Sequence, residues 1–365
     1  MRFWIVGGGT GGHVYPALAA AQALQTVAPD AALTWIGTVG GMEEALVTRE
    51  GIAFHAISGG GLHGVALLNA VRHGWELVHG LVEVRRLMQR ERPDAILTTG
   101  GYVSGPAATA ANWQHVPLLV YLPDIEPAQS VKAAARLAAR VAVTVEDSRQ
   151  FLPADKVVVT GYPLGERITR WTQAAGRAAL GLEEYAPVLL VFGGSRGARS
   201  INRALLPHLP ELTLLAHIVH VSGTLDWAEI EAARATLPEA VQARYHAYPY
   251  LHEEMGAAMA AADLVVCRAG ASTLGEFPYF GLPAILVPYP HAWRYQRVNA
   301  DWLAARGAAV VVEDADLPTQ LVPQVQALLT NTAQRAAMSA AARALARPDA
   351  AQHLAAELLS LARRQ

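Results

Sequence analysis

The sequence predicts an α/β protein of two Rossmann-like domains with parallel sheets, facing each other across a ligand. Two observations lead to this prediction. A short apolar run that ends in a glycine cluster and opens a helix occurs twice, at residues 2–13 and 188–198. Helix and strand patterns also alternate along the whole chain, which favours parallel strands joined by helices. The 365 residues exceed one ordinary core, so two domains are expected.

Short apolar runs bounded by glycine or proline mark the strands of the first half. The segment 16–27, between the first two of them, has the composition of a helix. Residues 162–186 contain prolines and glycine without a strong period, so we expect the interdomain connection there, after an N-terminal domain at 1–161. The strands expected in that domain lie at residues 2–6, 32–37, 95–99, 117–121, 140–145 and 157–160.

The second half repeats this order in a domain expected at residues 187–347. From Leu317 onward the chain is alanine-rich and helical, until Pro348 interrupts it. Families with two facing Rossmann domains often return a last helix, here residues 348–365, to the first domain. The strands expected in the second domain lie at residues 188–192, 216–221, 264–267, 284–287 and 308–312.

Composition limits the class of protein. Hydrophobic residues make up 52% and charged residues 16% of the chain, as in a well-buried globular protein, and the net charge of −2 does not indicate nucleic-acid binding. The single cysteine, Cys267, cannot form an internal disulfide, which favours a reducing, cytoplasmic location. No apolar run approaches the ~20 residues of a membrane span, so any membrane contact is expected at the bilayer surface.

The first glycine cluster also satisfies the dinucleotide pattern G-x-G-x-x-G at Gly7, Gly9 and Gly12. A nicotinamide enzyme would need a carboxylate at the end of the second strand to bind the ribose hydroxyls. That strand instead ends in Gly37 and Thr38, so the sequence disfavours a dinucleotide site.

His13 directly follows the first glycine cluster, at the expected start of a helix. An imidazole titrates near neutral pH and can take a proton from an attacking hydroxyl. A lone histidine in such a place is more often a cap or a solvated side chain. The surrounding sequence Gly-Gly-His-Val-Tyr-Pro favours a general base.

The triplet Asp314-Ala315-Asp316 has the form of a metal-binding DxD motif. It stands directly before Leu317-Pro318, where a helix begins. Helix capping explains it better, and we expect no metal and no cofactor.

Five collinear blocks carry a family resemblance. Residues 8–18 read GGTGGHVYPAL and closely resemble the opening of the MurG family. Four further blocks agree with that family, at residues 100–106, 193–199, 267–276 and 281–299. Together they span most of the chain.

The resemblance implies an inverting GT-B enzyme of glycosyltransferase family 28. Its expected reaction moves GlcNAc from UDP-GlcNAc to the C4 hydroxyl of undecaprenyl-diphospho-N-acetylmuramoyl-pentapeptide in peptidoglycan synthesis, with His13 as the base. The acceptor would lie near Gly101, Tyr102 and Ser104. The expected location is peripheral, at the cytoplasmic face of the cell membrane.

The same resemblance places the donor mainly on the C-terminal domain. Ser195 and the backbone of 270–273 are candidates for the diphosphate cradle, since glycine loops and helix N-termini stabilise a departing diphosphate. Glu276 would receive both ribose hydroxyls, unless it is an ordinary surface glutamate. Gln296 and Asn299 would read the sugar, Arg268 would orient the site or contact uridine, and His252 would lie near the base. The full expected donor set is Thr10, Gly11, Gly12, Asp124, Gly165, Ser195, His252, Arg268, Gly270, Ala271, Ser272, Thr273, Leu274, Gly275, Glu276, Gln296 and Asn299.

Residues 65–92 combine an apolar face with five arginines. Such a helix can lie on an anionic bilayer, or it can pack on its own sheet. Residues alone favour neither alternative, and the family resemblance favours the membrane.

Three departures from the family concern residues expected at the cleft, and they bear on both the donor sugar and the acceptor. An expected asparagine is Asp124, an expected arginine is Gly165 with Arg167 two residues on, and an expected glutamine is Tyr295. They keep open a second hypothesis, a transferase of the same kind with another lipid acceptor. A UDP-GlcNAc 2-epimerase and a non-catalytic sugar-nucleotide-binding regulator are less favoured, the first by the family blocks and the second by the retained His13 and Glu276.

Overall fold

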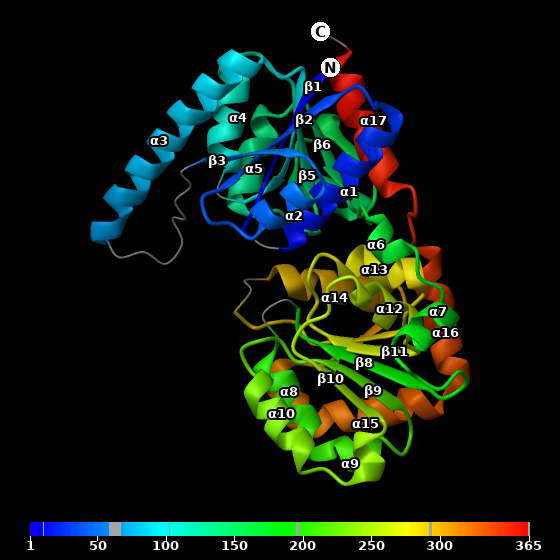
Figure 1. The fold of residues 1–365 in the computed structure, drawn as a ribbon. Coiled ribbons are helices and arrows are strands. Elements are labelled where there is room, and N and C mark those ends of the chain that lie inside the picture. Colours follow the sequence, from blue (N-terminus) through cyan, green and yellow to red (C-terminus); the bar gives the residue numbers. More distant parts are fainter. Residues whose placement is uncertain (10, 58–66, 102, 195–196, 292–293, 364–365) are drawn as a thin grey trace. The chain divides into compact units, whose positions relative to one another are not determined.

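The computed structural model describes residues 1–9, 11–57, 67–101, 103–194, 197–291 and 294–363. The chain forms two compact units, the first made of Met1–Gly165 with Pro348–Gln365 and the second of Glu166–Arg347. Each unit has one parallel sheet with helices on both faces (Figure 1). The predicted class, α/β with two parallel-sheet domains, is confirmed.

The sheet of the first unit has seven strands in the order β3-β2-β1-β4-β5-β6-β7. Alternate residues of β1 point to opposite faces, as the pleat of a strand requires. Phe3 and Ile5 enter the core under α1 and α17, whereas Trp4 and Val6 enter the core under α3, α4 and α5. The strands are β1 (Arg2–Gly7), β2 (Ala32–Thr38), β3 (Ala53–Ile57), β4 (Ala95–Gly100), β5 (Leu118–Leu122), β6 (Arg140–Val143) and β7 (Val157–Val159).

The helices of the first unit include the chain's last one, α17, which lies along α1 (Figure 1). Leu354 and Leu358 of α17 are buried in the same core as Leu24 of α1, so the C-terminal helix completes this unit. The α-helices are α1 (Gly11–Val27), α2 (Glu43–Arg49), α3 (Leu67–Glu91), α4 (Ser104–Trp113), α5 (Gln129–Leu137) and α17 (Ala350–Ala362).

The sheet of the second unit has six strands in the order β10-β9-β8-β11-β12-β13. They are β8 (Val188–Phe192), β9 (His217–Val221), β10 (Tyr245–Tyr248), β11 (Leu264–Cys267), β12 (Ala284–Leu286) and β13 (Ala309–Val311). The α-helices are α6 (Glu166–Thr169), α7 (Gln173–Ala179), α8 (Arg199–Leu205), α9 (Leu209–Leu212), α10 (Trp227–Ala235), α11 (Glu239–Gln242), α12 (Glu254–Ala261), α13 (Thr273–Phe280), α14 (Tyr295–Ala305), α15 (Leu317–Thr330) and α16 (Thr332–Ala344).

The segment 162–186, considered above as the connection, is divided between the units after Gly165. Its helix α7 packs so closely on α12 that a Cβ at Gly176 would overlap the Ala257 carbonyl oxygen. The side chain of Arg177 is buried and pairs with Asp263 at 2.8 Å. Most of this segment therefore belongs to the second unit.

Both sheets change the direction of their strand order beside a glycine loop. The reversal lies between β1 and β4 in the first sheet and between β8 and β11 in the second. Ligands of open α/β sheets bind outside the carboxyl ends of the strands at such a reversal. The two glycine loops, which follow β1 and β8, therefore stand where each fold offers a binding site.

Candidate functional site

His13 lies in the first turn of α1, and β4 fixes its ring. Its Nδ1 is 2.7 Å from the carbonyl oxygen of Thr99, and the Thr99 hydroxyl donates to the His13 carbonyl oxygen at 2.8 Å. A carbonyl oxygen only accepts, so Nδ1 carries the proton and Nε2 of the neutral ring keeps its lone pair. The ring is held as the tautomer in which Nε2 can act as a base.

Two glycines at the end of β4 allow this arrangement. Gly100 and Gly101 have φ angles of +117° and +90°, which side-chain-bearing residues rarely adopt. A Cβ at Gly100 would lie 2.7 Å from Nδ1 of His13, and one at Gly101 would lie 2.6 Å from the Gly8 carbonyl oxygen. The glycine pair therefore lets β4 approach both the histidine and the first glycine loop.

Glu43 is a site residue that the sequence analysis missed. Its side chain is fully buried, and its carboxylate accepts from the backbone N–H of Thr38 at 2.8 Å and of Gly9 at 3.4 Å. A Cβ at Gly8 or Gly41 would overlap that carboxylate. Glu43 thus supports the first glycine loop through its backbone, and both oxygens face protein rather than a ribose.

The other predicted residues of the first unit are placed as follows. Ser104 is buried, with its hydroxyl 2.7 Å from that of Thr98, so it fixes the start of α4. Gly11 and Gly12 form the first turn of α1. Three predicted residues, Thr10, Tyr102 and Ser195, lie outside the described residues.

Asp124 and Gly165 mark two departures from the family pattern. Asp124 is half-buried in the loop after β5. A Cβ at Gly165 would meet nothing closer than 3.4 Å, at Oε1 of Gln22, and its φ is not positive. The backbone therefore does not require glycine at position 165.

Arg167 and His252 both lie near Glu253 in the second unit, Arg167 through an ion pair and His252 as the preceding residue. Arg167 Nη1 is 3.9 Å from a Glu253 carboxylate oxygen, so the arginine after Gly165 is directed to an ion pair in its own unit. His252 is exposed, and its ring meets that of Tyr250 edge-on at 4.7 Å between centroids.

The second glycine loop follows β8 and meets the end of β9. Gly194 and Gly197 have φ angles of +88° and +80°. A Cβ at Gly197 would overlap the carbonyl oxygen of Ser222. The backbone of this loop is therefore packed against the backbone that follows β9.

A chain of buried polar groups holds the backbone that follows β9. Asn202 donates to the Ser222 carbonyl oxygen at 2.9 Å and to Asp226 at 3.0 Å. Nε2 of His220 is 3.0 Å from Asn202 Oδ1, which only accepts, and Nδ1 is 2.7 Å from the Tyr245 hydroxyl. The neutral imidazole is thus fully bonded, and burial lowers the pKa of His220 to about 3.

The loop between β11 and α13 and the first turn of α13 carry the largest group of predicted donor residues. Both the N–H and the hydroxyl of Thr273 donate to the Gly270 carbonyl oxygen, at 3.1 and 2.7 Å. Glu276 lies in the first turn of α13; burial raises the pKa of its carboxyl, and a hydrogen bond with Ser272 opposes this rise. The remaining members are buried Ala271 and Leu274 and half-buried Gly275.

Arg268 follows β11 and is held on several sides. Its Nη1 is 2.5 Å from Asp314 and donates to the Val287 carbonyl oxygen at 3.2 Å, while Nη2 donates to the Ser200 hydroxyl at 2.8 Å. Ser200 in turn donates to Asp314 at 2.7 Å. The guanidinium carbon lies 5.2 Å from the ring centroid of Tyr289.

The interpretation of the Asp314 triplet as a helix cap is wrong. Asp316 precedes α15, and its side chain accepts no hydrogen bond from that helix. Asp314 instead pairs with Arg268. Among the described residues, no cluster of three or more histidine, cysteine, aspartate or glutamate side chains could hold a metal ion.

Gln296 and Asn299 lie one turn apart on α14. Oε1 of Gln296 accepts from the Tyr289 N–H at 2.9 Å, which leaves its amide N–H groups for other partners. Asn299 is fully buried and donates to the Ala269 carbonyl oxygen at 3.2 Å, directly before Gly270. The two amides therefore hold the loop after β12 and the loop after β11, respectively.

The region 65–92 forms α3, whose side chains are described from His79 onward. In this part, Val84 and Met88 are buried in the core above the sheet. The C-terminal half of α3 therefore packs on its own sheet as an amphipathic helix. Arg85, Arg86 and Arg90 are exposed on it. No helix in the described part of the chain has the length and apolar character needed to cross a membrane.

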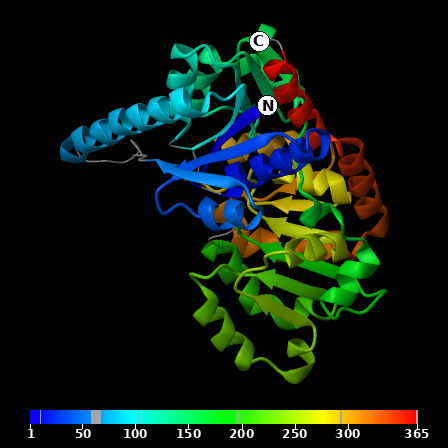
Figure 2. The same cartoon turned by 45° about the horizontal axis from the view of Figure 1, so that its top comes forward.

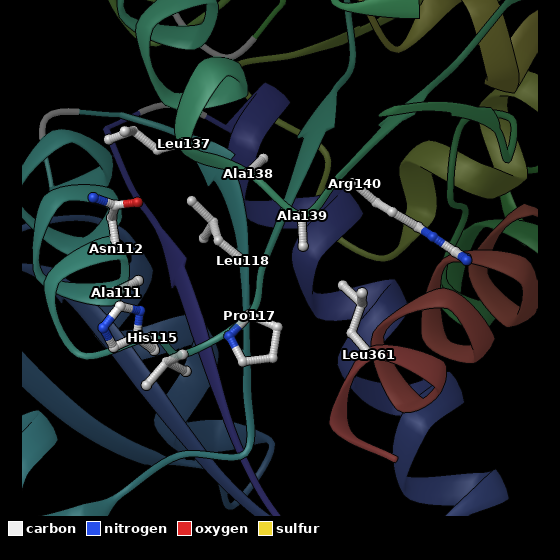
Figure 3. Close-up of a pocket in the computed structure, with 11 residues that line it drawn as sticks. Ala111, Asn112, His115, Pro117, Leu118, Leu137, Ala138, Ala139, Arg140 and Leu361 are labelled. Atoms are coloured by element: carbon white, nitrogen blue, oxygen red, sulfur yellow. The ribbon is translucent and has the colours of Figure 1, made fainter. Parts of the chain in front are cut away.

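A pocket of about 460 Å³ opens at the end of the first sheet where its strands begin (Figure 3). It lies beside Leu118 and Arg140, which begin β5 and β6, with His115 and Leu361 also on its wall. The glycine loop follows the carboxyl end of β1, so this pocket is away from the residues predicted for chemistry.

Family models match both halves of the chain. The "Glycosyltransferase family 28 N-terminal domain" matches residues 3–143, and the "Glycosyltransferase family 28 C-terminal domain" matches residues 188–354. The curated relatives include enzymes named UDP-N-acetylglucosamine–N-acetylmuramyl-(pentapeptide) pyrophosphoryl-undecaprenol N-acetylglucosamine transferase. The one from Roseiflexus sp. is 44% identical, covering 97% of this chain and 94% of the relative. The one from Symbiobacterium thermophilum is 39% identical, covering 100% and 97%.

Solved structures agree with this. MurG from Acinetobacter baumannii superposes with a TM-score of 0.78 at 28% identity, over 98% of this chain and 99% of that one. A UDP-GlcNAc 2-epimerase from Neisseria meningitidis gives a TM-score of 0.68 at 14% identity, over 99% and 100% of the two chains. The second likeness is one of fold alone.

Proposed function

This chain belongs to the MurG family within glycosyltransferase family 28, and we propose that it transfers GlcNAc from UDP-GlcNAc to undecaprenyl-diphospho-N-acetylmuramoyl-pentapeptide. One observation carries this proposal: the similarity to enzymes named for that reaction runs through both units from end to end. The same similarity makes an epimerase or a non-catalytic regulator a poorer explanation.

The fixed tautomer of His13 supports its role as the general base. Nε2 takes the proton of the acceptor's C4 hydroxyl as that oxygen attacks the anomeric carbon of GlcNAc. The new bond forms between the C4 oxygen and the anomeric carbon. The bond from that carbon to the β-phosphate oxygen breaks, and UDP leaves with the electron pair. Because the C4 oxygen attacks the face opposite to the departing UDP, the configuration of that carbon is inverted.

The loops of the second unit support donor binding. The backbone N–H groups of the second glycine loop and of residues 270–272, directly before α13, are suited to the charge that develops on the departing diphosphate. Glu276 accepts from both ribose hydroxyls. Gln296 offers its free amide N–H groups to the sugar, and Asn299 acts beside it by fixing Ala269 and the loop 270–273.

We further propose that the protein works at the cytoplasmic face of the cell membrane as a peripheral enzyme. Support comes from α3, which extends well beyond the edge of its sheet in two views (Figures 1 and 2). Residues 67–78 contain three leucines, two valines and Trp75, and arginines follow at 85, 86 and 90. Sedimentation with anionic vesicles tests this: Trp75→Glu should reduce binding, whereas Val39→Glu, a change at an exposed residue elsewhere, should not. Equal binding of both variants would count against this surface.

A second acceptor remains a candidate because Asp124, Gly165 and Tyr295 depart from the family pattern. Release of UDP from UDP-GlcNAc distinguishes the two. Release that requires lipid-linked muramyl-pentapeptide and yields a disaccharide lipid supports the proposed reaction. Donor binding without such release would favour a different lipid acceptor.

A further inference from the structure

Arg268 connects the segments that follow four neighbouring strands. These strands are adjacent in the sheet, in the order β8-β11-β12-β13. Ser200 comes after β8, Arg268 after β11, Val287 after β12 and Asp314 after β13, and the guanidinium contacts the other three. A single side chain thus ties together the carboxyl edge of most of this sheet.

The contacts leave the charge of Arg268 compensated by protein. Its side chain is only 10% exposed, and both terminal nitrogens already donate to protein acceptors. The Ser200 hydroxyl accepts from Arg268 and donates to Asp314, which closes a triangle of three polar groups. This arrangement suits a positioning function better than direct neutralisation of a diphosphate.

Two of the anchored loops are those assigned to the donor. Ser200 is three residues after Gly197 of the second glycine loop, and Arg268 is two residues before Gly270. A change in their separation therefore displaces backbone N–H groups on both loops. Because such groups act only when held in the geometry of the reacting phosphate, small displacements are costly.

We propose that Arg268, Asp314 and Ser200 form a clamp that sets the spacing of the two donor loops, with Asp314 and Ser200 as positioning residues. The inference rests on the proposed function, since it takes UDP-GlcNAc as the donor. It also gives Asp314, which sequence reasoning considered only as a metal ligand or a cap, a role in positioning the donor loops.

Calorimetric binding of UDP-GlcNAc and UDP to the full chain tests the clamp. Asp314→Asn and Arg268→Gln should each weaken binding about tenfold. The double variant should bind as tightly as the single variant with the lower affinity. Glu313→Gln is the matched control, because Glu313 directly precedes Asp314 and the change removes only its exposed ion pair with Arg297. Its binding should equal that of the unchanged protein.

Melting temperatures separate positioning from folding. If the two variants melt lower but bind donor normally, the groups only stabilise the fold and the clamp is refuted. Additive losses in the double variant would show that Arg268 acts on donor independently of Asp314, which also refutes it. Should either variant fail to fold, Ser200→Ala keeps the ion pair and should still weaken binding, by about threefold, half a power of ten; unchanged affinity there refutes the clamp.

The proposed function fails in a different way. If the unchanged protein binds neither UDP-GlcNAc nor UDP, the family reaction itself is wrong for this chain, and the clamp falls with it. If the unchanged protein binds both ligands and the variants match it, only the clamp is wrong.

Discussion

The carbonyl oxygen of Thr99, at the end of β4, lies 2.7 Å from Nδ1 of His13, in the first turn of α1. The two residues are 86 positions apart in sequence, and they meet because β1 and β4 are hydrogen-bonded neighbours. This contact decides which nitrogen of His13 can accept a proton.

Replacing His13 with alanine or glutamine should lower kcat by about 10²–10⁴-fold, the range expected for loss of a general base. Calorimetric binding of UDP should stay unchanged, since Glu276 and the loop 270–273, to which the ribose and the diphosphate are assigned, belong to the second unit. His208→Ala, at a partly exposed histidine paired with Glu211, is the control and should retain full turnover. A His13 variant with normal turnover would remove this residue as the base.

Replacing Gly100 with alanine should destabilise the first unit by roughly 1–3 kcal/mol, because φ is +117° and the new Cβ would press on the His13 ring. Turnover of the folded protein should also fall. Gly105→Ala adds a Cβ in open space at the start of α4 and serves as the control. Equal melting temperatures and rates for both variants would contradict the proposed support of His13.

Glu43→Ala should lower the free energy of unfolding by roughly 1–3 kcal/mol, because it leaves the N–H groups of Thr38 and Gly9 without their buried acceptor. Glu43→Gln keeps one oxygen acceptor and should lose less. Urea unfolding of both variants provides the measurement. A larger loss for glutamine than for alanine would show that the loop does not depend on this oxygen.

Glu276→Ala should weaken UDP about tenfold or more while leaving 2′,3′-dideoxy-UDP nearly unaffected, because a carboxylate can discriminate only through hydroxyls that are present. Calorimetry with both ligands gives the comparison. The control is Glu254→Ala, at an exposed position on α12. Equal weakening of both ligands would exclude the ribose assignment.

The second unit should lose stability in mild acid because of His220. Its folded pKa is about 3, below the ordinary value of 6.5, so the unfolded chain binds the additional proton. Stability is therefore full above about pH 6.5 and falls as the pH decreases towards 3, by at most about 1.4 kcal/mol per pH unit for one proton. Urea unfolding at pH 7 and pH 5.5 measures this change.

His220→Gln can keep the hydrogen bonds to Asn202 and Tyr245 without titrating. Its unfolding free energy should change less between these two pH values than that of the unchanged protein. The same pH dependence in both proteins would assign the acid sensitivity to other groups, such as His246, whose pKa burial also lowers, to about 4.

Sequence patterns located the central strands of both sheets and missed the first sheet's β3 and the second sheet's β10. Each missed strand is at the edge of its sheet. A central strand is buried on both faces and reads as a continuous apolar run, whereas these edge strands are only partly buried and contain histidine. Apolar periodicity therefore identifies the interior of such sheets better than their edges.

The sequence by itself determined the two-unit α/β architecture and the two glycine loops, because local apolar runs and glycine clusters encode strands and tight turns directly. It also predicted His13 as the general base. Only the tertiary structure decided the partners of Glu43, Arg268 and Asp314. Those contacts join loops after different strands, and the spacing of residues along the chain does not record which carboxyl ends meet. Parallel sheet order brings them together, so the support of the site is a property of topology.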